Sequence, residues 1–545
     1  MINSTDTDEI FRRFEEMKRL RSNFESHWQE IAERILTRSA EFTGERSAGD
    51  KRTALQYDAS AALALERFAA AVESLLTPRG ARWHTLRASN PYIDQDDDAR
   101  LWFDAVEDIL FRWRGRPKAN FASQMHEGYM SLGAFGNGIL FVDEDAAAGM
   151  RYRNIHLMNC FLAEDEMGNI DTVFRILDLA ARQVMRMFED GDLSTAMRAK
   201  IDKEPDARVK LLHVVMPRTD RDPVRKDKQN LPWFSAYYEI DAQHKIEEGG
   251  FSELPYIPSR YVTGASSEVY GRSPAMTVLP DIKMLNEMSK TVIRAGQKVV
   301  DPPLLIADDG VLLPVNSKPG GSTFARLDGR SQAPVQPLFT GARVDIGLDL
   351  MEQRRRVIND AFLVTLFQIL VETPSMTATE VLSRAQEKGA LLAPTVGRQQ
   401  AETLGPLVQR ELAILQRQQL LPPMPDIMIE AQGEYDIEYT SPLSRAMKAE
   451  EGVAILRTLE MVQPIAAMDP SVMDNFDNDQ IVRILADTNG TPMKIMKRKD
   501  EIAAVRQARQ QNEQMAAMVQ GAPQAADAAL KVSQIASAAQ VPPQI

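Results

Sequence analysis

The sequence of 545 residues contains a single cysteine, Cys160. One cysteine excludes an intrachain disulfide framework and any metal site built from several thiolates. The six histidines are scattered and never pair at ligand spacing, which argues against a histidine-based metal site. We therefore expect no cofactor, a reducing cytoplasm as the place of folding, and a cysteine that serves as a small buried apolar residue.

The sequence also lacks long hydrophobic runs and a secretion signal. Its start, Met1-Ile-Asn-Ser-Thr-Asp, has neither the basic nor the apolar region of a signal peptide. The longest apolar run, residues 361–371, is far shorter than the ~18 residues needed to cross a bilayer. These absences predict a soluble cytoplasmic product without membrane contact.

Net positive charge is lacking as well. The chain has 64 Lys and Arg against 77 Asp and Glu, which gives a net charge of −13. Proteins that coat DNA are usually basic because they neutralise phosphates, so a bulk DNA-coating role is disfavoured and any nucleic-acid contact should be local or weak. The length predicts about three to four structural units.

Catalytic motifs are scarce. No Gly-x-x-x-x-Gly-Lys-Ser/Thr loop is present, so ATP hydrolysis on such a loop is unsupported. The glycine-rich segment 133–138 precedes a strand-like segment and is interpreted as a tight helix-to-strand connection rather than a nucleotide loop. The acidic run 94–98 could hold a hard cation, but Asp98 better fits the N-cap of the helix that follows. A structural or binding role is therefore favoured.

The apolar periodicity predicts a mainly helical α+β fold. We expect the N-terminal quarter to be helical, with helices at 7–38, 58–76, 95–114 and 118–133. From Gly138 the pattern changes to short β-branched or aromatic stretches, which predict antiparallel strands around 139–142, 152–156, 173–176, 210–215, 234–240 and 256–262. The interruption at 180–203 is predicted to be helical.

The second half returns to helices. A long helix is predicted at 274–300 and is ended by Asp301-Pro-Pro; a compact lobe of short strands and loops follows at 301–345. Helices are expected again at 346–370, from Thr377 and up to about 420, with two strands at 427–431 and 435–439. Residues from 443 onward are predicted to be helical, and the Ala- and Gln-rich tail is either an extended helix or disordered.

Basic residues gather on the two long helices that flank the lobe, at Lys283, Lys290, Arg294, Lys298, Arg354, Arg355 and Arg356. Their ordinary interpretation is a solvated helix face, in which Glu287 pairs with Lys290 or Arg294. A second basic group lies at Lys494 and 497–499. Neither group has the interleaved aromatic residues of a single-strand stacking platform.

Several segments, read in order, resemble the portal protein, or head-to-tail connector, of short-tailed phages (podoviruses). They are Tyr57-Asp-Ala-Ser-Ala-Ala to Ser74-Leu-Leu-Thr-Pro-Arg-Gly-Ala-Arg-Trp, Leu132-Gly-Ala-Phe-Gly-Asn-Gly-Ile-Leu-Phe-Val, Gly250-Phe-Ser-Glu-Leu-Pro-Tyr, Tyr270-Gly-Arg-Ser-Pro-Ala, Leu279-Pro-Asp-Ile-Lys, Asp301-Pro-Pro and Thr377-Ala-Thr-Glu. Together they span roughly residues 55–380, and their order and spacing are more specific than any one of them. Beyond about residue 445 no motif matches.

This resemblance implies a ring, normally a dodecamer, at one vertex of the phage capsid. It implies a wing at 1–272, comprising a helical part at 1–137 and an α+β part at 138–272. It further implies stem helices at 273–300 and 346–371, a clip at 301–345, and a tunnel loop, long helix and returning wing strands at 372–442. A helical crown or C-terminal tail would occupy 443–545. Such a subunit would assemble in the host cytoplasm and reside in the virion.

The resemblance also implies partners and contact residues. Double-stranded DNA would pass through the ring, which would meet the large terminase subunit, tail adaptor and tail tube proteins, major capsid and scaffolding proteins, and internal core or ejection proteins. The basic stem residues named above would supply local channel contacts. Tunnel-loop candidates are Glu372, Thr373, Pro374, Ser375 and Lys388, and clip docking candidates are Asp308, Asp309, Lys318, Arg326 and Arg330.

Two alternatives remain open at this point. One is a different virion structural or adaptor protein of the head-tail junction. The other is an enzyme that uses carboxylates such as Asp281 and Glu287, which would require two buried acids to converge in a pocket.

Overall fold

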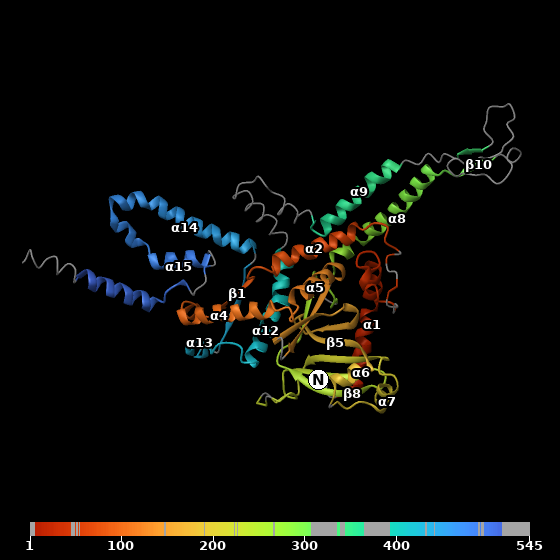
Figure 1. Cartoon of the computed structure of the whole chain (residues 1–545), viewed down its shortest axis with the longest axis horizontal. Helices are drawn as coiled ribbons and strands as arrows, with labels where there is room; N and C mark the ends of the chain where they lie inside the picture. Colours follow the sequence, from red (N-terminus) through yellow and green to blue (C-terminus); the bar gives the residue numbers. More distant parts are fainter. Residues whose placement is uncertain are drawn as a thin grey trace, which may run out of the picture. The chain divides into compact units, whose positions relative to one another are not determined.

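The computed structural model of the chain (Figure 1) describes residues 6–44, 49–50, 53, 55–145, 149–189, 191–222, 224–225, 227–264, 268–306, 335–337, 344–364, 393–430, 433–440, 442–488, 491 and 495–514. It forms two compact units: Met1–Trp83, Ile109–Leu421 and Ser441–Leu443 make the first, and His84–Asp108, Pro422–Thr440 and Ser444–Ile545 the second. The predicted α+β, mainly helical class is confirmed. None of the described helices is long and apolar enough to span a bilayer.

A five-stranded antiparallel sheet forms one part of the first unit. Its strands follow chain order: β4 (Cys160–Glu164), β5 (Ile170–Ala180), β6 (Arg208–Pro217), β7 (Trp233–Glu239) and β8 (His244–Phe251). Helix α1 (Thr7–Ala32) buries its apolar stripe against one face, where Phe14 meets the Phe161 ring at 5.0 Å between centroids. Helices α6 (Ala181–Met187) and α7 (Thr195–Lys203) pack through Val184 and Met197 in a second core cluster.

A three-stranded sheet in the order β3–β2–β9 forms the centre of the first unit. It comprises β2 (Asn137–Asp145), β3 (Gly149–Asn154) and β9 (Tyr256–Arg260). Helix α5 (Phe121–Phe135) runs directly into β2 and packs against α2 (Ser60–Leu76). The two helices approach closely at Gly133, where an added Cβ would lie 2.6 Å from Leu65 Cδ1.

Two long helices, α8 (Pro274–Val300) and α9 (Val344–Ala361), lie side by side as an antiparallel pair (Figure 1). Short strands β10 (Leu304–Ile306) and β11 (Val335–Pro337) pair beyond their far ends. Residues 393–399 are helical and continue into a π-helix, η3 (Gln400–Leu404), and then α12 (Gly405–Arg417).

The second unit joins distant parts of the sequence. Strand β1 (His84–Ala88) pairs with β12 (Tyr435–Tyr439), and α3 (Pro91–Asp94) and the start of α4 (Asp97–Arg114) follow β1. Its other elements are α13 (Asp426–Glu430), α14 (Pro442–Met468), the 3₁₀ turn η4 (Pro470–Asn475), α15 (Asn478–Thr488) and a helix at 499–514. Arg483 binds the Asp97 carboxylate at 2.6 Å, and the same carboxylate accepts the Lys499 backbone N–H at 2.9 Å.

Several predictions about these elements were wrong. Residues 427–431 were expected to be a strand, but α13 forms instead; one helical turn buries Met428 while Ile429 stays 59% exposed, and so short an apolar run does not distinguish the two structures. The N-terminal quarter is not purely helical, because it contains β1. The first helix ends at Ala32 rather than 38, and is followed by the short 3₁₀ turn η1 (Thr37–Ser39).

Three further differences concern local structure. Asp96, not Asp98, caps α4, because its Oδ1 accepts the N–H groups of Asp98 and Ala99 at 3.0 Å each. Strands β4 and β8 were not predicted; β4 follows the 3₁₀ turn η2 (Leu157–Asn159). Most of the predicted lobe at 301–345 and the start of the helix predicted from Thr377 lie outside the described residues.

Candidate functional site

The helix pair α8–α9 and its attachment to the rest of the first unit form the candidate functional site, because several of the described segments that carry the family resemblance lie there. Helix α8 begins at a complete cap: Ser273 Oγ accepts the Met276 N–H at 3.0 Å and donates to the Ala134 carbonyl at 2.8 Å. Pro274 occupies the first helical position, where its missing N–H costs nothing. The start of α8 is thereby fixed to the end of α5.

Two glycines meet beside this cap. Gly136 ends α5 with φ +78°, and an added Cβ would lie 2.4 Å from the Gly271 carbonyl oxygen; a Cβ on Gly271 would lie 2.5 Å from that of Gly136. The Asn137 side chain bridges the crossing by accepting the Gly271 N–H at 3.0 Å. The prediction of a tight helix-to-strand connection at 133–138 is confirmed, and residues 270–273 lie directly across it.

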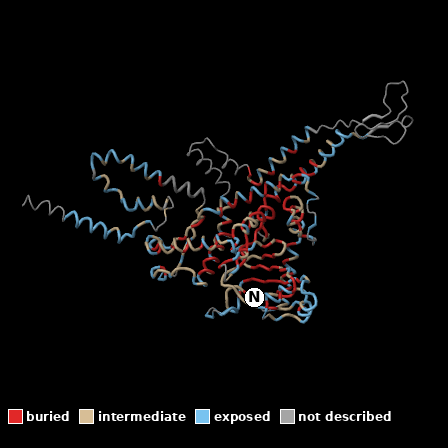
Figure 2. The backbone as a smooth tube through the Cα atoms, in the orientation of Figure 1, coloured by how far each residue is buried: buried red, intermediate tan, exposed pale blue. Residues whose placement is uncertain are grey.

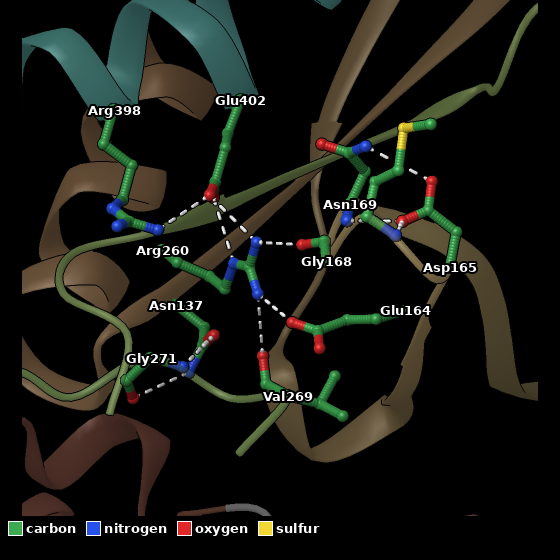
Figure 3. A network of polar contacts seen from close by, with 11 residues as sticks. Asn137, Glu164, Asp165, Gly168, Asn169, Arg260, Val269, Gly271, Arg398 and Glu402 are labelled. Carbon is green, nitrogen blue, oxygen red and sulfur yellow. Dashed lines mark hydrogen bonds and ion pairs between the residues drawn. The ribbon is translucent and has the colours of Figure 1, made fainter. Parts of the chain in front are cut away.

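Arg260, at the end of β9, is the centre of a buried polar network (Figure 3). It is 3% exposed. Its Nη2 and Nε donate to the two Glu402 oxygens at 2.9 and 3.1 Å, and its Nη1 donates to Glu164. Nη2 also reaches the Gly168 carbonyl at 2.8 Å, and Arg398 binds Glu402 from the other side at 3.0 Å. One guanidinium thus joins β9, the β4–β5 hairpin and the π-helix.

The electrostatics of this network favour the ion pairs. Burial would lower the pKa of Arg260, but Glu402 and Glu164 outweigh it and raise the pKa. The backbone takes part as well, because Gln399 Nε2 donates to the Arg260 carbonyl at 2.7 Å. Thr403 in turn donates to Gln399 at 3.2 Å. These bonds hold in place the π-helix, a form that is rare without such support.

A second buried anchor, at Asp58, joins α2 to both long helices. The Asp58 carboxylate accepts the Ser60 N–H at 2.8 Å, which caps α2, and it accepts Arg355 Nη2 of α9 at 2.8 Å. Asn286 of α8 accepts the N–H groups of Tyr57 and Asp58 at 2.8 and 3.1 Å. Burial opposes ionisation of Asp58, but the hydrogen bonds from Ser60 and Arg355 outweigh it and lower the pKa.

The two long helices are also joined directly. Arg354 of α9 binds Asp281 of α8 at 2.8 Å. Nearer the far end, Gly347 lies so close to α8 that an added Cβ would be 2.7 Å from Val292 Cγ2. The pair therefore has one register, set by an ion pair at the base and a glycine contact further out.

The seven basic residues predicted on these helices divide into two sets. Five form ion pairs within the chain: Arg354 and Arg355 as above, Lys283 with Glu30 at 2.6 Å, Lys290 with Glu287 at 3.7 Å, and Arg356 with Glu352 at 3.8 Å. The Glu287–Lys290 pair is the ordinary helix-face interaction that was expected. Arg356 is nevertheless 75% exposed, while Arg294 and Lys298 are exposed and have no ion pair among the described residues.

The remaining predicted site residues lie outside the described part of the chain. These are the tunnel-loop candidates Glu372, Thr373, Pro374, Ser375 and Lys388, and the clip candidates Asp308, Asp309, Lys318, Arg326 and Arg330.

The carboxylates considered for an enzyme do not converge. Asp281 is paired with Arg354, and Glu287 is 72% exposed beside Lys290. The described residues contain no group of three or more His, Cys, Asp or Glu side chains able to hold a metal ion. Cys160 is buried, and burial raises the pKa of its thiol to about 12, so it stays protonated at neutral pH.

Residue-by-residue sequence reasoning missed the two anchors. Asp58 carried a usable signal, since an Asp at the start of an amphipathic helix often accepts a backbone N–H group of the first turn. Asn286 carried a weaker signal, as a polar residue beside the apolar stripe of a long helix. Arg260 and Glu402 gave no signal, because only the fold brings residues 142 positions apart into contact.

The comparisons with known proteins cover nearly the whole chain. The chain is 27% identical over 547 residues to the "Probable portal protein" of Bordetella phage BPP-1, covering 98% of this chain and 97% of the relative. It is 26% identical over 533 residues to the "Portal protein" of Salmonella phage epsilon15, covering 96% and 95%. A solved virion structure of a native gene transfer agent particle aligns with 78% of this chain and 88% of its own, at 12% identity and a TM-score of 0.33, which is too low to support an argument.

The model of the family described as "Bacteriophage head to tail connecting protein" matches residues 7–496. This span includes parts of both units and the whole of the α8–α9 pair. The chain belongs to the bacteriophage head to tail connecting protein family.

Proposed function

We propose that copies of this chain form a portal ring, most simply a dodecamer, at the head-tail junction, and that double-stranded DNA passes through its centre. The observation that carries the proposal is the surface of the α8–α9 pair. Helix α8 is buried in its first half and exposed in its second (Figure 2). The exposed apolar side chains on the two helices are Met284, Ile293, Val299, Val300, Ile346, Leu348, Leu350 and Val357.

Such a surface is unusual for a protein that remains monomeric. Val300 is 86% exposed, Val299 58% and Leu348 52%, and apolar patches of this kind mark interaction sites. In a closed ring each subunit presents one face to its neighbour and receives the opposite face of the next, so the same apolar side chains are covered all around. A ring therefore gives these side chains partners without requiring a different protein.

The domain boundaries belong to the same proposal. Residues 1–272 would be the wing and 273–300 with 346–371 the stem. Residues 301–345 would be the clip and 372–442 the tunnel loop with the long helix and the return to the wing; 443–545 would be the crown. The antiparallel packing of α8 on α9 and the β10–β11 pairing beyond them support this arrangement, since they bring the two ends of 301–345 together.

We further propose the partners. The clip would dock the large terminase subunit during packaging and a tail adaptor, followed by tail tube proteins, afterwards. The wing and crown would face the major capsid and scaffolding proteins and the internal core or ejection proteins. The ring would be a passive conduit, with the motor ATPase on another chain.

Charge supports weak rather than tight contact with DNA. The net charge of −13 disfavours static binding, since each neutralised phosphate would strengthen retention. Five of the seven basic stem residues already form ion pairs within the chain. Arg294 and Lys298, which have no ion pair among the described residues, are therefore the best candidates for contacts with DNA or with a neighbouring stem.

The decisive experiment is to image the purified full-length protein by negative-stain electron microscopy and weigh it by native mass spectrometry. Rings with a central hole are expected. Leu348→Glu should reduce the ring fraction strongly, while Leu20→Glu, at a leucine that is 63% exposed on α1, should leave it unchanged. A wild-type protein that stays monomeric at all concentrations would refute the proposal.

A further inference from the structure

Three arginines on the two sheets of the first unit interact electrostatically and make no ion pair among the described residues. Arg151 and Arg153 are two apart on β3 and so share one face; they are paired across the strand with Asp143 and Phe141 of β2. Arg175, on β5 of the other sheet, approaches the same face, with its guanidinium carbon 5.6 Å from the centre of the Phe141 ring. Arg153 and Arg175 thus border one aromatic side chain, and Arg151 lies two residues further along the same face.

Arg175 is the unusual member, because it is a buried cation. It is 9% exposed, and its Nε is buried without a hydrogen-bond partner among the described residues. The phenol of Tyr256 is a hydrogen-bonding neighbour of Arg175, but it is neutral. A buried guanidinium without a paired carboxylate is costly, since desolvation of the charge is not offset.

Among the described residues no carboxylate pairs with this charge. Burial lowers the pKa of His213 to about 3, so this histidine, which lies opposite Arg175 on β6, is neutral. Asp143 is the carboxylate opposite Arg151; partial desolvation raises its pKa although it keeps exposed surface, and it makes no ion pair among the described residues. Two arginines of α12 lie near these acids, Arg410 near Asp143 and Arg417 near Glu144. Both are paired with Glu253, at 2.6 and 2.9 Å.

Repulsion within the group is visible in its electrostatics. Partial desolvation of its inner atoms and the charges of Arg175 and Arg151 lower the pKa of Arg153, whose outer surface stays exposed; an ion-paired arginine shows the reverse. Arg151 and Arg153 are exposed, so a ligand can reach them from solvent. The arrangement combines an accessible rim of two guanidiniums with a buried third.

We propose that Arg151, Arg153 and Arg175 form a binding site for a phosphate group. Planar guanidinium groups match the oxygen geometry of phosphate. The three arginines and Asp143 together carry a net charge of about +2, which a phosphate charge of about −2 would balance. A single phosphate rather than a duplex fits, because Arg175 is buried beside Phe141 and a rigid double helix could reach only the rim. The phosphate could belong to inorganic phosphate or to the phosphodiester backbone of a flexible strand.

The test uses the purified full-length protein and isothermal titration with inorganic phosphate, at constant ionic strength against chloride. Arg153→Gln should weaken binding by about tenfold or more, the loss expected for a charge-assisted hydrogen bond. Arg198→Gln serves as the matched control, since Arg198 is 63% exposed on α7 and lies outside this group. Asp143→Asn should instead strengthen binding, because it removes a negative charge from the site; this gain cannot arise from misfolding.

A second titration with a four-residue oligothymidylate distinguishes the two sources. Binding of phosphate alone, with the same dependence on Arg153, would identify a free anion, and competition by the oligonucleotide would identify a phosphodiester; either supports the site. Equal phosphate affinity in wild type, Arg153→Gln and Asp143→Asn would overturn the proposal. So would a ring structure in which a carboxylate of the neighbouring copy fills the position between Arg153 and Arg175. Ring formation is measured separately, so failure of this site leaves the portal proposal untouched.

Discussion

Arg355 of α9 donates to the buried Asp58 carboxylate at 2.8 Å, and that carboxylate also caps α2. Asp58 side-chain exposure is only 6%, so the arginine is the charge partner that makes burial of the carboxylate tolerable. The pair fixes the base of the long helices to a helix more than two hundred residues earlier in the chain. Several measurable consequences follow from this and the other anchors.

The first prediction concerns the Asp58–Arg355 pair. Arg355→Gln should lower the free energy of unfolding by about 1 to 3 kcal/mol, because a buried carboxylate loses its charged donor. Arg356→Gln is the matched control: the next residue is 75% exposed and its loss should change stability by less than about 0.5 kcal/mol. Urea denaturation followed by circular dichroism measures both. Equal effects of the two substitutions would contradict the assignment of Arg355 as an anchor.

The second prediction concerns the glycine crossing. Gly271→Ala should destabilise the protein by more than about 2 kcal/mol, because its Cβ would be 2.5 Å from the Gly136 carbonyl oxygen and the backbones would have to separate. Gly296→Ala in α8, where a Cβ meets nothing within 4 Å, should be neutral or stabilising by about 0.5 to 1 kcal/mol. Thermal unfolding of the two variants provides the comparison, and a tolerated Gly271→Ala would show that the crossing is looser than described.

The third prediction concerns the Arg260 network. Arg260→Gln should cost about 3 kcal/mol, since Glu402 loses a two-bond donor and Glu164 its partner in a buried setting. Arg272→Gln, at a 52%-exposed arginine paired with Glu268 four residues away, should cost less than about 1 kcal/mol. Hydrogen exchange should accelerate selectively in residues 393–417 of the first variant. Uniform exchange across the unit would indicate general destabilisation instead of a local anchor.

The fourth prediction concerns pH and His213. Its ring is buried, stacks on Tyr237 at 4.1 Å and contacts the Tyr256 hydroxyl at 2.7 Å through Nδ1. Burial lowers its pKa to about 3, against about 6.5 in an unfolded chain, so between these values the unfolded state binds more protons. Stability should fall as the pH drops below 6.5, with a contribution of at most about 1.4 kcal/mol per pH unit.

The control for this prediction is His213→Gln, which keeps a polar group at the site and does not titrate. Its stability should be lower than that of the wild type at pH 7.5, yet depend less on pH between 7.5 and 5. Chemical denaturation at several pH values gives both slopes. Parallel slopes would assign the acid sensitivity to other groups.

Local sequence signals predicted the elements that the chain specifies locally. Helix α8 was predicted with its observed bounds, because Ser273 and Pro274 mark its start and Asp301-Pro302 its end. The resemblance to portal proteins was confirmed, because the chain belongs to the head to tail connecting family. The prediction of a structural rather than an enzymatic role was confirmed with it.

Non-local partners explain what the sequence could not reveal. Strand β1 has five residues and pairs with β12, about 350 positions away, so no local sequence pattern predicts it. The same limit affects the site: the basic stripe on α8 and α9 was visible, but Glu30 and Asp58, which neutralise Lys283 and Arg355, come from other helices. Apolar periodicity shows on which face of a helix a basic residue lies, but not which carboxylate contacts it there.

The β1–β12 pair also determines when the second unit can be completed during synthesis. Arg87 and Glu438 face each other across 351 positions, and a ribosome adding roughly 5 to 20 residues per second needs roughly 20 to 70 s to cover that interval. During that time β1 is an unpaired strand, while the residues of the first unit that lie between β1 and β12 in the sequence are synthesised. During this time β1 must be kept from pairing with a strand of another nascent chain. A fragment that stops before Tyr435 would lack β12 and would leave β1 unpaired.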